Sequence, residues 1–246
     1  MLNFKQNTDF DLIGLGEVML RLSPQGKEKI SQSETFEKTV GGSELNVVSG
    51  AAMLGARSAI LTKIPNNKIG HFVRNKIRYG NVSDDYLVYD DSPDARLGLY
   101  YYESGAYPRK SSVIYDRAGS SVCSLKLSDI PEDIYGKTKV FHMSSITLAL
   151  SDTLRQTALE ILKKFHEAGA YISFDVNYRA ALWSEEEAKQ VVESVFPYVD
   201  FLFVSEETSR RMLQRTGTLE EIMRGYAKDY GCTLVATTRR EVVSPM

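Results

Sequence analysis

The chain has 246 residues, of which 30 are Lys or Arg and 32 are Asp or Glu, so its formal net charge at pH 7 is −2. This near-neutral charge argues against a nucleic acid or a membrane surface as the partner, and a hydrophobic fraction of 43% is that of an ordinary globular protein. Cys123 and Cys232 lie far apart without metal-ligand spacing, and no run approaches the ~18 apolar residues of a membrane helix, so we expect a protein of the reducing cytoplasm.

Short apolar runs alternate with helical patterns along most of the chain. The strands are expected at 11–16, 56–64, 138–145, 170–176, 199–205 and 232–238, and the helices at 43–54, 70–80, 151–169 and 184–196. The clearest helix, 151–169, begins at a serine cap, carries an apolar stripe and ends at a glycine. This alternation predicts an α/β fold in which helices cover both faces of a mainly parallel sheet.

Two β-rich segments, at about 20–40 and 96–118, break this alternation. In the second, "RLGLYYYE" and "SSVIYDRAG" are joined by the turn-like "SGAYPRK", with no helix between them. We therefore expect a small antiparallel element inserted into the α/β domain. It is either an edge extension of the main sheet or a lid over a site, and we favour the lid.

Generic signatures exclude several classes of enzyme. The stretch "GLGEVM" has two glycines of the dinucleotide fingerprint, but Met19 stands where the third should fall, which disfavours a Rossmann dehydrogenase. Neither GxxxxGK[ST] nor GxSxG occurs. His71, His142 and His166 share no ligand spacing, so we expect them at the surface or in the core and expect no direct metal ligands.

The stretch "VGGSELNVVSGAAMLG" places Gly41 and Gly42 just before a helix. A backbone without Cβ atoms allows a ligand to come close, and the free N–H groups of a helix N-terminus suit an anionic or hydroxyl-rich ligand. Asn46 lies one helical turn beyond Gly42, where its amide could bond a sugar hydroxyl. The alternative is a simple glycine turn followed by an asparagine satisfied in the core.

A second polar group follows the strand expected at 170–176. In "SFDVNYRAALW", the residues Asp175, Asn177, Tyr178 and Arg179 end that strand. Ligands of open α/β sheets bind at the carboxyl ends of strands, and an arginine there can fork onto a carboxylate. The alternative is a solvated loop between a strand and a helix.

Four motifs together carry a family resemblance: "VGGSELNVVSGAAMLG", "YDRAGS", "FDVNYRAALW" and "LFVSEE". The chain closely resembles the ribokinase-like (PfkB) sugar kinases over nearly its whole length and in the same order, and most of all their 2-keto-3-deoxygluconate kinase branch. The resemblance implies one ribokinase-like domain over 1–246, a three-layer α/β/α fold with a β lid. It also implies phosphorylation of a terminal sugar hydroxyl with ATP and Mg²⁺, with a monovalent cation as an additional candidate cofactor.

The resemblance also implies the residues that contact the sugar, which are Gly42, Asn46, Tyr100, Tyr115, Arg117 and Arg179. Two cations, Arg117 and Arg179, suit a substrate that carries a carboxylate. We therefore expect 2-keto-3-deoxygluconate to be converted to its 6-phosphate. A kinase for a neutral sugar, of the fructokinase or ribokinase type, is the alternative within the family.

The nucleotide side departs from the family pattern. Where the family usually has an Asn-x-x-Glu box, this sequence reads Ser205, Glu206, Glu207 and Thr208. Threonine cannot replace the glutamate, and the neighbouring Glu207 points elsewhere on a helix. Asn177, Ser205 and Glu207 are the candidates that remain on this side.

The glycine-rich GAGD segment of the family, with its catalytic aspartate, is absent from these 246 residues. The sequence therefore predicts a domain that is incomplete at its C-terminal end, with no catalytic base in this chain and the expected aspartate beyond Met246. Positioning of the sugar hydroxyl is expected to be present, whereas stabilisation of the transferring phosphoryl group is largely missing. The alternative function is a fragment that binds a sugar acid without phosphorylating it.

The lid also predicts a homodimer, because lids of the family often pair across a dimer. In the run of tyrosines, Tyr100 and Tyr102 should share one face of a strand while Tyr101 takes the other. We expect one face to cover the sugar and the other to meet the partner subunit. The alternative is a lid that packs only on its own domain.

Overall fold

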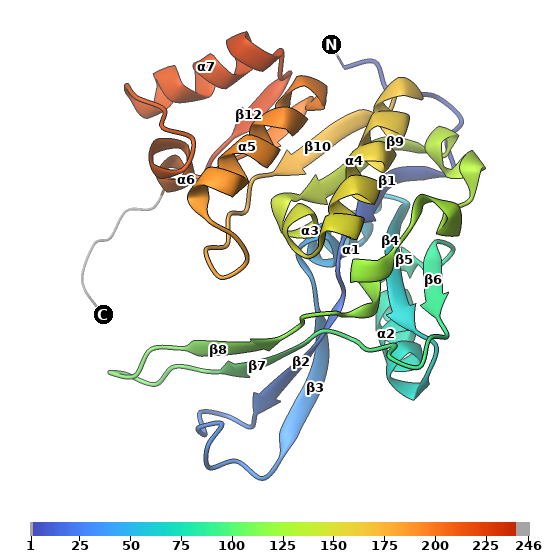
Figure 1. Cartoon of the computed structure of the whole chain (residues 1–246), viewed down its shortest axis with the longest axis vertical. Helices are drawn as coiled ribbons and strands as arrows, with labels where there is room; N and C mark the ends of the chain where they lie inside the picture. The colour runs from blue at the N-terminus through green and yellow to red at the C-terminus, as the bar shows by residue number, and fades with distance from the viewer. Residues whose placement is uncertain (1, 240–246) are drawn as a thin grey trace.

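The structure, a computed structural model, describes residues 2–239. Its main sheet has the order β12-β11-β10-β9-β1-β4-β5, with β6 alongside β4, and its paired strands run parallel. The strands are β1 (Phe10–Leu15), β4 (Ser58–Pro65), β5 (Val82–Ser83), β6 (Leu87–Asp90), β9 (Thr138–Ser144), β10 (Tyr171–Asp175), β11 (Phe201–Phe203) and β12 (Leu234–Ala236). Parallel strands need crossover connections, and the helices of Figure 1 supply most of them.

The helices begin where the sequence provides caps. They are α1 (Ser43–Met53), α2 (Lys68–Tyr79), α3 (Ser145–Ala149), α4 (Asp152–Glu167), α5 (Glu185–Val195), α6 (Glu206–Arg211) and α7 (Leu219–Tyr230), with 3-10 turns η1 (Ser121–Ser124), η2 (Leu127–Asp129), η3 (Glu132–Gly136) and η4 (Phe196–Tyr198). The expected serine cap of α4 is confirmed, because Ser151 Oγ accepts a hydrogen bond from the Leu154 amide at 3.1 Å.

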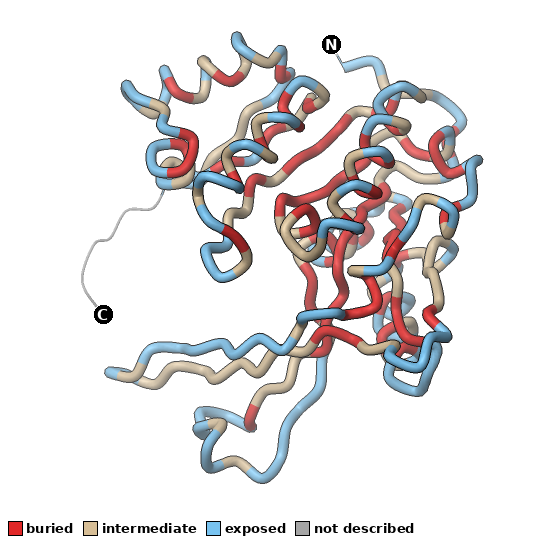
Figure 2. The backbone as a smooth tube through the Cα atoms, viewed as in Figure 1, coloured by how far each residue is buried: buried red, intermediate tan, exposed pale blue. Residues whose placement is uncertain are grey.

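Two apolar cores lie on opposite faces of the sheet, because side chains alternate along each strand. In β4, Leu61 belongs to the larger core with the buried face of α4, whereas Ile60 belongs to the smaller core with α1 and α2. Figure 2 shows the central strands largely buried. The apolar stripe expected on α4 is fully buried and consists of Leu154, Ala158, Ile161, Leu162 and Phe165. The three-layer α/β/α architecture expected from the sequence is thus confirmed.

A second, smaller sheet projects from the main body and forms the lid (Figure 1). Its order is β3-β2-β7-β8, with β2 (Met19–Pro24), β3 (Phe36–Gly41), β7 (Leu99–Glu103) and β8 (Ser112–Asp116). The expectation of a purely antiparallel element is wrong, because the central pair β2 and β7 is parallel. Both strands leave the body in the same direction, and each returns through its own antiparallel partner.

Some elements were not expected from the sequence. They include the short strands β5 and β6 and the helix α3, which are too short to show a period. Cys123 and Cys232 are free thiols. Among the described residues, no helix has both the length and the apolar character needed to cross a membrane.

Candidate active site

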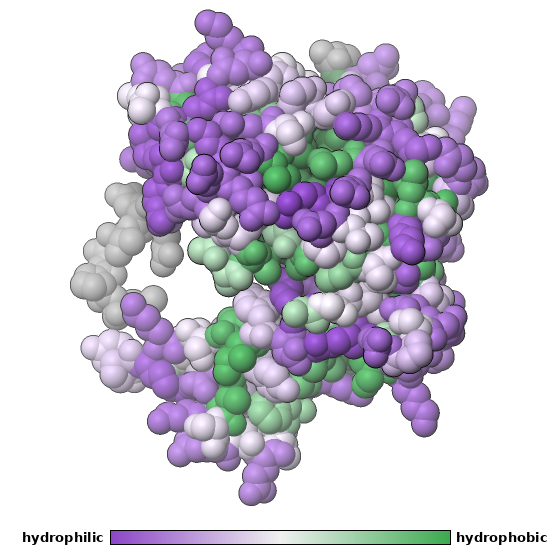
Figure 3. All heavy atoms as spheres, viewed as in Figure 1, coloured by the Kyte–Doolittle hydropathy of each residue, from purple (hydrophilic) through white to green (hydrophobic). Residues whose placement is uncertain are grey.

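A cleft of about 1070 Å³ lies between the lid and the carboxyl ends of the main strands, and we call it the lid cleft. The surface is hollowed between the body and the lid in Figure 3. The residues predicted to contact the sugar come from four separate segments, and the structure brings all of them to this cleft: Gly42, Asn46, Tyr100, Tyr115, Arg117 and Arg179. The second β-rich segment therefore belongs to a separate sheet that borders the cleft and is not an extension of the main sheet.

The N-terminus of α1 opens onto the lid cleft. Gly42 is the N-cap residue and offers no side chain to the first-turn amides, so these remain available to a ligand. The Asn46 side chain is exposed and makes no hydrogen bond with any residue that the structure describes. The alternative of an asparagine satisfied in the core is therefore wrong, and the free amide lies at the cleft.

The lid contributes two tyrosines on one face. Tyr100 and Tyr115 are directly opposite across β7 and β8, and their ring centroids are 5.8 Å apart. Both line the lid cleft, whereas Tyr101 does not, as the expected alternation of faces requires. Burial raises the pKa of Tyr100, so its hydroxyl is a neutral donor and acceptor near pH 7.

The loop after β10 is held by its own polar groups. The backbone N–H of Asn177 donates to Asp175 Oδ1 at 3.1 Å, and the Tyr178 hydroxyl donates to the backbone carbonyl of Trp183 at 3.2 Å. The Asn177 side-chain amide donates to Ser43 Oγ at 3.0 Å, which ties the loop to the first turn of α1. The loop is thus an ordered wall of the site, and the alternative of a purely solvated loop is wrong.

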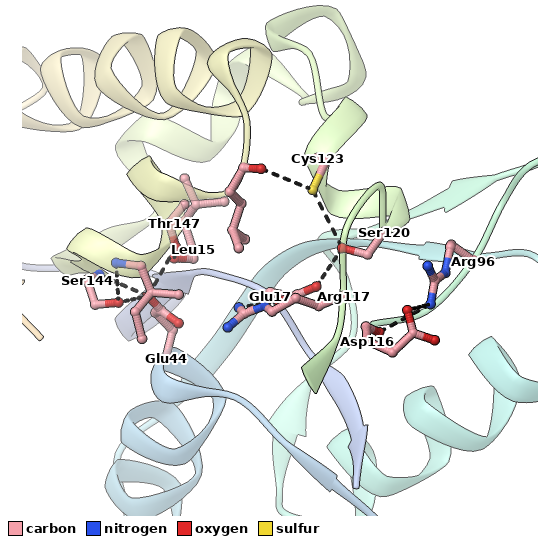
Figure 4. Close-up of polar contacts among 12 residues, drawn as sticks. Leu15, Glu17, Glu44, Arg96, Asp116, Arg117, Ser120, Cys123, Ser144 and Thr147 are labelled. Carbon is pink, nitrogen blue, oxygen red and sulfur yellow. Dashed lines mark hydrogen bonds and ion pairs between the residues drawn. The ribbon is translucent and has the colours of Figure 1, made fainter. Parts of the chain in front are cut away.

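The two predicted cations of the cleft differ in their surroundings. Arg117 forms an ion pair with Glu17, and Ser120 Oγ donates to the same carboxylate at 2.5 Å. Figure 4 shows this group at the base of the lid. Arg179 is exposed and has no ion-pair partner among the residues that the structure describes. Arg179 therefore presents to the cleft a guanidinium without an ion-pair partner, with the Asp175 carboxylate near enough to interact with it electrostatically, whereas Arg117 is directly paired with Glu17.

A second cavity of about 650 Å³ adjoins the lid cleft. Asn177, Tyr178 and Arg179 line both spaces, so one loop separates them and touches both. All three residues predicted for the nucleotide side line the second cavity: Asn177, Ser205 and Glu207. The structure thus places two candidate binding spaces side by side, with Arg179 at their junction.

The segment in place of the Asn-x-x-Glu box serves as a helix cap. Ser205 Oγ accepts from the Thr208 amide at 3.1 Å and is 2.8 Å from Thr208 Oγ1, and Glu207 accepts from Arg211 at 3.0 Å. Apolar walls from Phe203 and the hydroxyls of Thr237 and Thr238 complete the cavity. These residue types fit a nucleotide, because they offer both an apolar surface and polar groups.

The described residues contain no group of three His, Cys, Asp or Glu side chains that could hold a metal ion by themselves. Mg²⁺ usually keeps several waters and binds one or two carboxylates together with substrate phosphates. Asp175 and Glu207 line the second cavity and fit that limited role. Burial raises the pKa of Asp175, and a nearby cation would favour its ionised form.

Sequence reasoning missed two buried carboxylates that line the lid cleft, Glu17 and Glu44. Glu44 is 1% exposed, and its Oε1 accepts from the Ser144 amide at 2.9 Å, the Ser144 hydroxyl at 2.6 Å and Thr147 Oγ1 at 3.1 Å (Figure 4). Burial raises the pKa of Glu44. The signal in the sequence was a single acidic residue directly after a buried strand and another in the first turn of an apolar helix.

Comparison with known proteins decides the family. The model of the pfkB family carbohydrate kinases matches residues 9–239. The chain belongs to this family. The resemblance found in the sequence motifs is therefore confirmed, and the chain is that of a phosphotransferase that acts on carbohydrates.

The relatives include kinases of 2-dehydro-3-deoxy (2-keto-3-deoxy) sugar acids. The chain is 39% identical over 231 residues to the 2-dehydro-3-deoxygalactonokinase of Haloferax volcanii, which covers 94% of this chain and 72% of that protein. The crystal structure of the 2-dehydro-3-deoxygluconokinase of Thermotoga maritima superposes with a TM-score of 0.89 at 35% identity, over 96% of this chain and 73% of that one. An uncharacterized sugar kinase of Pyrococcus horikoshii in complex with ATP has a TM-score of 0.74 at 26% identity, over 82% of this chain and 66% of that one.

Proposed function

We propose that this kinase phosphorylates a 2-keto-3-deoxy sugar acid, most naturally 2-keto-3-deoxygluconate or its C4 epimer, at the terminal hydroxyl. The observation that carries the proposal is Arg179, a guanidinium that has no ion-pair partner among the described residues and lies at the junction of the two cavities. A guanidinium can bind a carboxylate through two parallel hydrogen bonds, and a neutral sugar would leave it without a partner. Relatives named for both epimers support the substrate class.

The residues of the lid cleft have distinct roles in this proposal. Arg179 binds the carboxylate, and Asn46 with the amides at Gly42 binds hydroxyl groups. The rings of Tyr100 and Tyr115 cover the sugar and keep water from competing for these polar groups. The chain thereby positions the substrate hydroxyl, which is a large part of catalysis in phosphoryl transfer.

We place the phosphoryl donor, ATP, in the second cavity. Bound there with Mg²⁺, it would supply the phosphoryl group and the charge compensation that transfer requires. Asn177 and Ser205 would contact it, and Asp175 and Glu207 would hold the metal through its water shell. None of the described residues is assigned to accept the proton of the hydroxyl, and a monovalent cation is a further candidate cofactor.

We also propose that the protein is a homodimer and that it is located in the cytoplasm. The outer face of the lid exposes Ile114 and Phe36, which supports a homodimer through the lid. The free thiols of Cys123 and Cys232 support a location in the reducing cytoplasm.

The proposal is tested on the 246-residue chain with ATP, Mg²⁺ and each epimer of the keto acid, with gluconate and fructose as controls. Binding is followed by the fluorescence of Trp183, the single tryptophan, which directly follows the cleft residue Leu182. We expect saturable binding of a keto acid, and slow or no ADP release because none of the described residues is assigned as the base. Rapid ADP release with the keto acid would confirm the substrate and show that the residues present suffice. Stronger binding of fructose would favour the neutral-sugar alternative, and no sugar binding would contradict the proposal.

A further inference from the structure

Glu17 lies where the chain passes between the main body and the lid. The chain makes this passage four times: at 16–18 between β1 and β2, at 41–42 between β3 and α1, at 97–98 before β7, and at 117–120 after β8. Glu17 belongs to the first passage, and its own atoms contact the other three.

The contacts of Glu17 with the other passages are close. A Cβ at Gly98 would lie 2.5 Å from Glu17 Oε1, and a Cβ at Gly42 would lie 2.5 Å from the Glu17 carbonyl oxygen. Ser120 Oγ donates to Oε1 at 2.5 Å, and Arg117 donates to Oε2 (Figure 4). Glu17 thus contacts the other three passages of the chain at the base of the lid. Its replacement is therefore expected to change the position of the lid relative to the main body.

The ion pair of Glu17 is almost removed from water. The side chain of Glu17 is 3% exposed and that of Arg117 is 11% exposed. In such surroundings a charge left without its partner is costly, and its field is weakly screened. Each partner therefore fixes the other, and together they present almost no net charge to the lid cleft.

Arg117 nevertheless keeps hydrogen-bonding capacity toward a ligand. A guanidinium has five N–H donors, and Glu17 uses only part of them. The buried Nε of Arg117 has no partner among the described residues. A guanidinium whose charge is compensated still serves a hydroxyl or keto oxygen, while the carboxylate of the substrate is left to Arg179.

We propose that Glu17 is a positioning residue that sets the charge selectivity of the kinase. It holds Arg117 at the base of the lid and compensates its charge, so that Arg179 is the arginine of the lid cleft left without an ion-pair partner among the described residues, which matches a sugar acid with one carboxylate. This inference rests on the proposed function for its substrate class. It replaces the expectation that both arginines serve the carboxylate.

The test compares Glu17→Gln with Glu103→Gln in the 246-residue chain. Glu103 is a matched control, because it also pairs with an arginine of the lid, Arg109, but does not line the lid cleft. The ligands are 2-keto-3-deoxygluconate, its analogue with an alcohol in place of the carboxylate, and the corresponding dicarboxylic acid. Dissociation constants are measured from Trp183 fluorescence.

We expect Glu17→Gln to raise the affinity for the acid relative to the neutral analogue by about tenfold, and that for the diacid by more. The double variant Glu17→Gln/Arg117→Gln restores charge balance and should return these ratios to near the wild-type values. Glu103→Gln should leave them unchanged. A purely structural role of Glu17 would weaken all three ligands equally, and that result would overturn the selectivity.

A second readout needs no sugar. Hydrogen exchange of the Leu20 amide, which bonds the Gly98 carbonyl at 2.9 Å at the base of the lid, should be about tenfold faster in Glu17→Gln than in Glu103→Gln. Equal exchange in the two variants would overturn the positioning role. If the wild type binds no sugar acid, the proposed function fails, and this comparison still decides whether Glu17 positions the lid.

Discussion

The side-chain amide of Asn177 donates a hydrogen bond to the hydroxyl of Ser43 at 3.0 Å, across 134 residues of sequence. It joins the loop after β10 to the first turn of α1. Ser43 lines the lid cleft, and Asn177 lines both cavities. The bond therefore holds together the two motifs that carry the sugar-binding and junction residues.

Removing this bond should lower the affinity for the substrate more than it lowers the stability of the folded protein. We expect Asn177→Ala and Ser43→Ala each to weaken keto-acid binding about three- to tenfold, in line with one hydrogen bond, and the double variant to show little further loss. Calorimetric titration of the four proteins measures this. Asn66→Ala, which removes an exposed bond to Asp91, is the control and should bind normally. Fully additive losses at the two positions would contradict the coupling.

The charge of Arg179 should determine how strongly the protein prefers the sugar acid over its neutral alcohol analogue. Replacing Arg179 by alanine should weaken binding of the sugar acid by about tenfold or more, and binding of the neutral alcohol analogue much less, because only the acid loses a charged partner. Dissociation constants for both ligands decide this. Arg224→Ala removes a fully solvated arginine that pairs with Glu220 and should change neither. Equal losses for acid and alcohol would show that the carboxylate is bound elsewhere.

Stability should fall in mild acid because of His142. Burial lowers the pKa of this histidine from 6.5 to about 4, while its Nδ1 lies 2.9 Å from Ser173 Oγ. The unfolded chain therefore binds a proton below pH 6.5 that the folded chain does not, and stability decreases as the pH falls from 6.5 toward 4. Between pH 7 and pH 5 this one group should lower the free energy of unfolding by about 2 kcal/mol.

Urea unfolding at several pH values measures this contribution. His142→Leu removes the titrating group and should flatten the pH dependence by about 2 kcal/mol over that range, whatever its effect at neutral pH. His166→Ala, at an exposed position, should keep the slope of the wild type. An unchanged slope in His142→Leu would show that other groups carry the acid sensitivity.

The outer face of the lid should control the oligomeric state. Ile114 is 55% exposed and Phe36 is 36% exposed, and Phe36 packs edge-on against Tyr101 at 6.0 Å between ring centroids. We expect a dimer at micromolar concentration and a monomer for Ile114→Lys, because a charge in an apolar interface is costly. Light scattering distinguishes the two. Met53→Lys, at an exposed position of α1 outside the lid, should remain dimeric. A monomeric wild type would remove the dimer proposal for this chain.

Much of this protein could be predicted from local patterns. The period of apolar residues and the serine cap located α4, and the strand and helix alternation predicted the parallel sheet, because these signals depend on neighbours in sequence. The glycine pair before α1 and the polar run after β10 identified two walls of the site for the same reason. Short elements such as β5, β6 and α3 carried too few residues to show a period.

Only the tertiary structure decided which arginine of the lid cleft is paired with a carboxylate. Local patterns predicted the same role for Arg117 and Arg179, since both are arginines in sugar-binding motifs. Their roles differ because Glu17, 100 residues from Arg117 in sequence, lies against one of them and not the other. The parallel pairing of β2 with β7 was equally hidden, because pairing between distant strands depends on the path of the whole chain and leaves no local pattern.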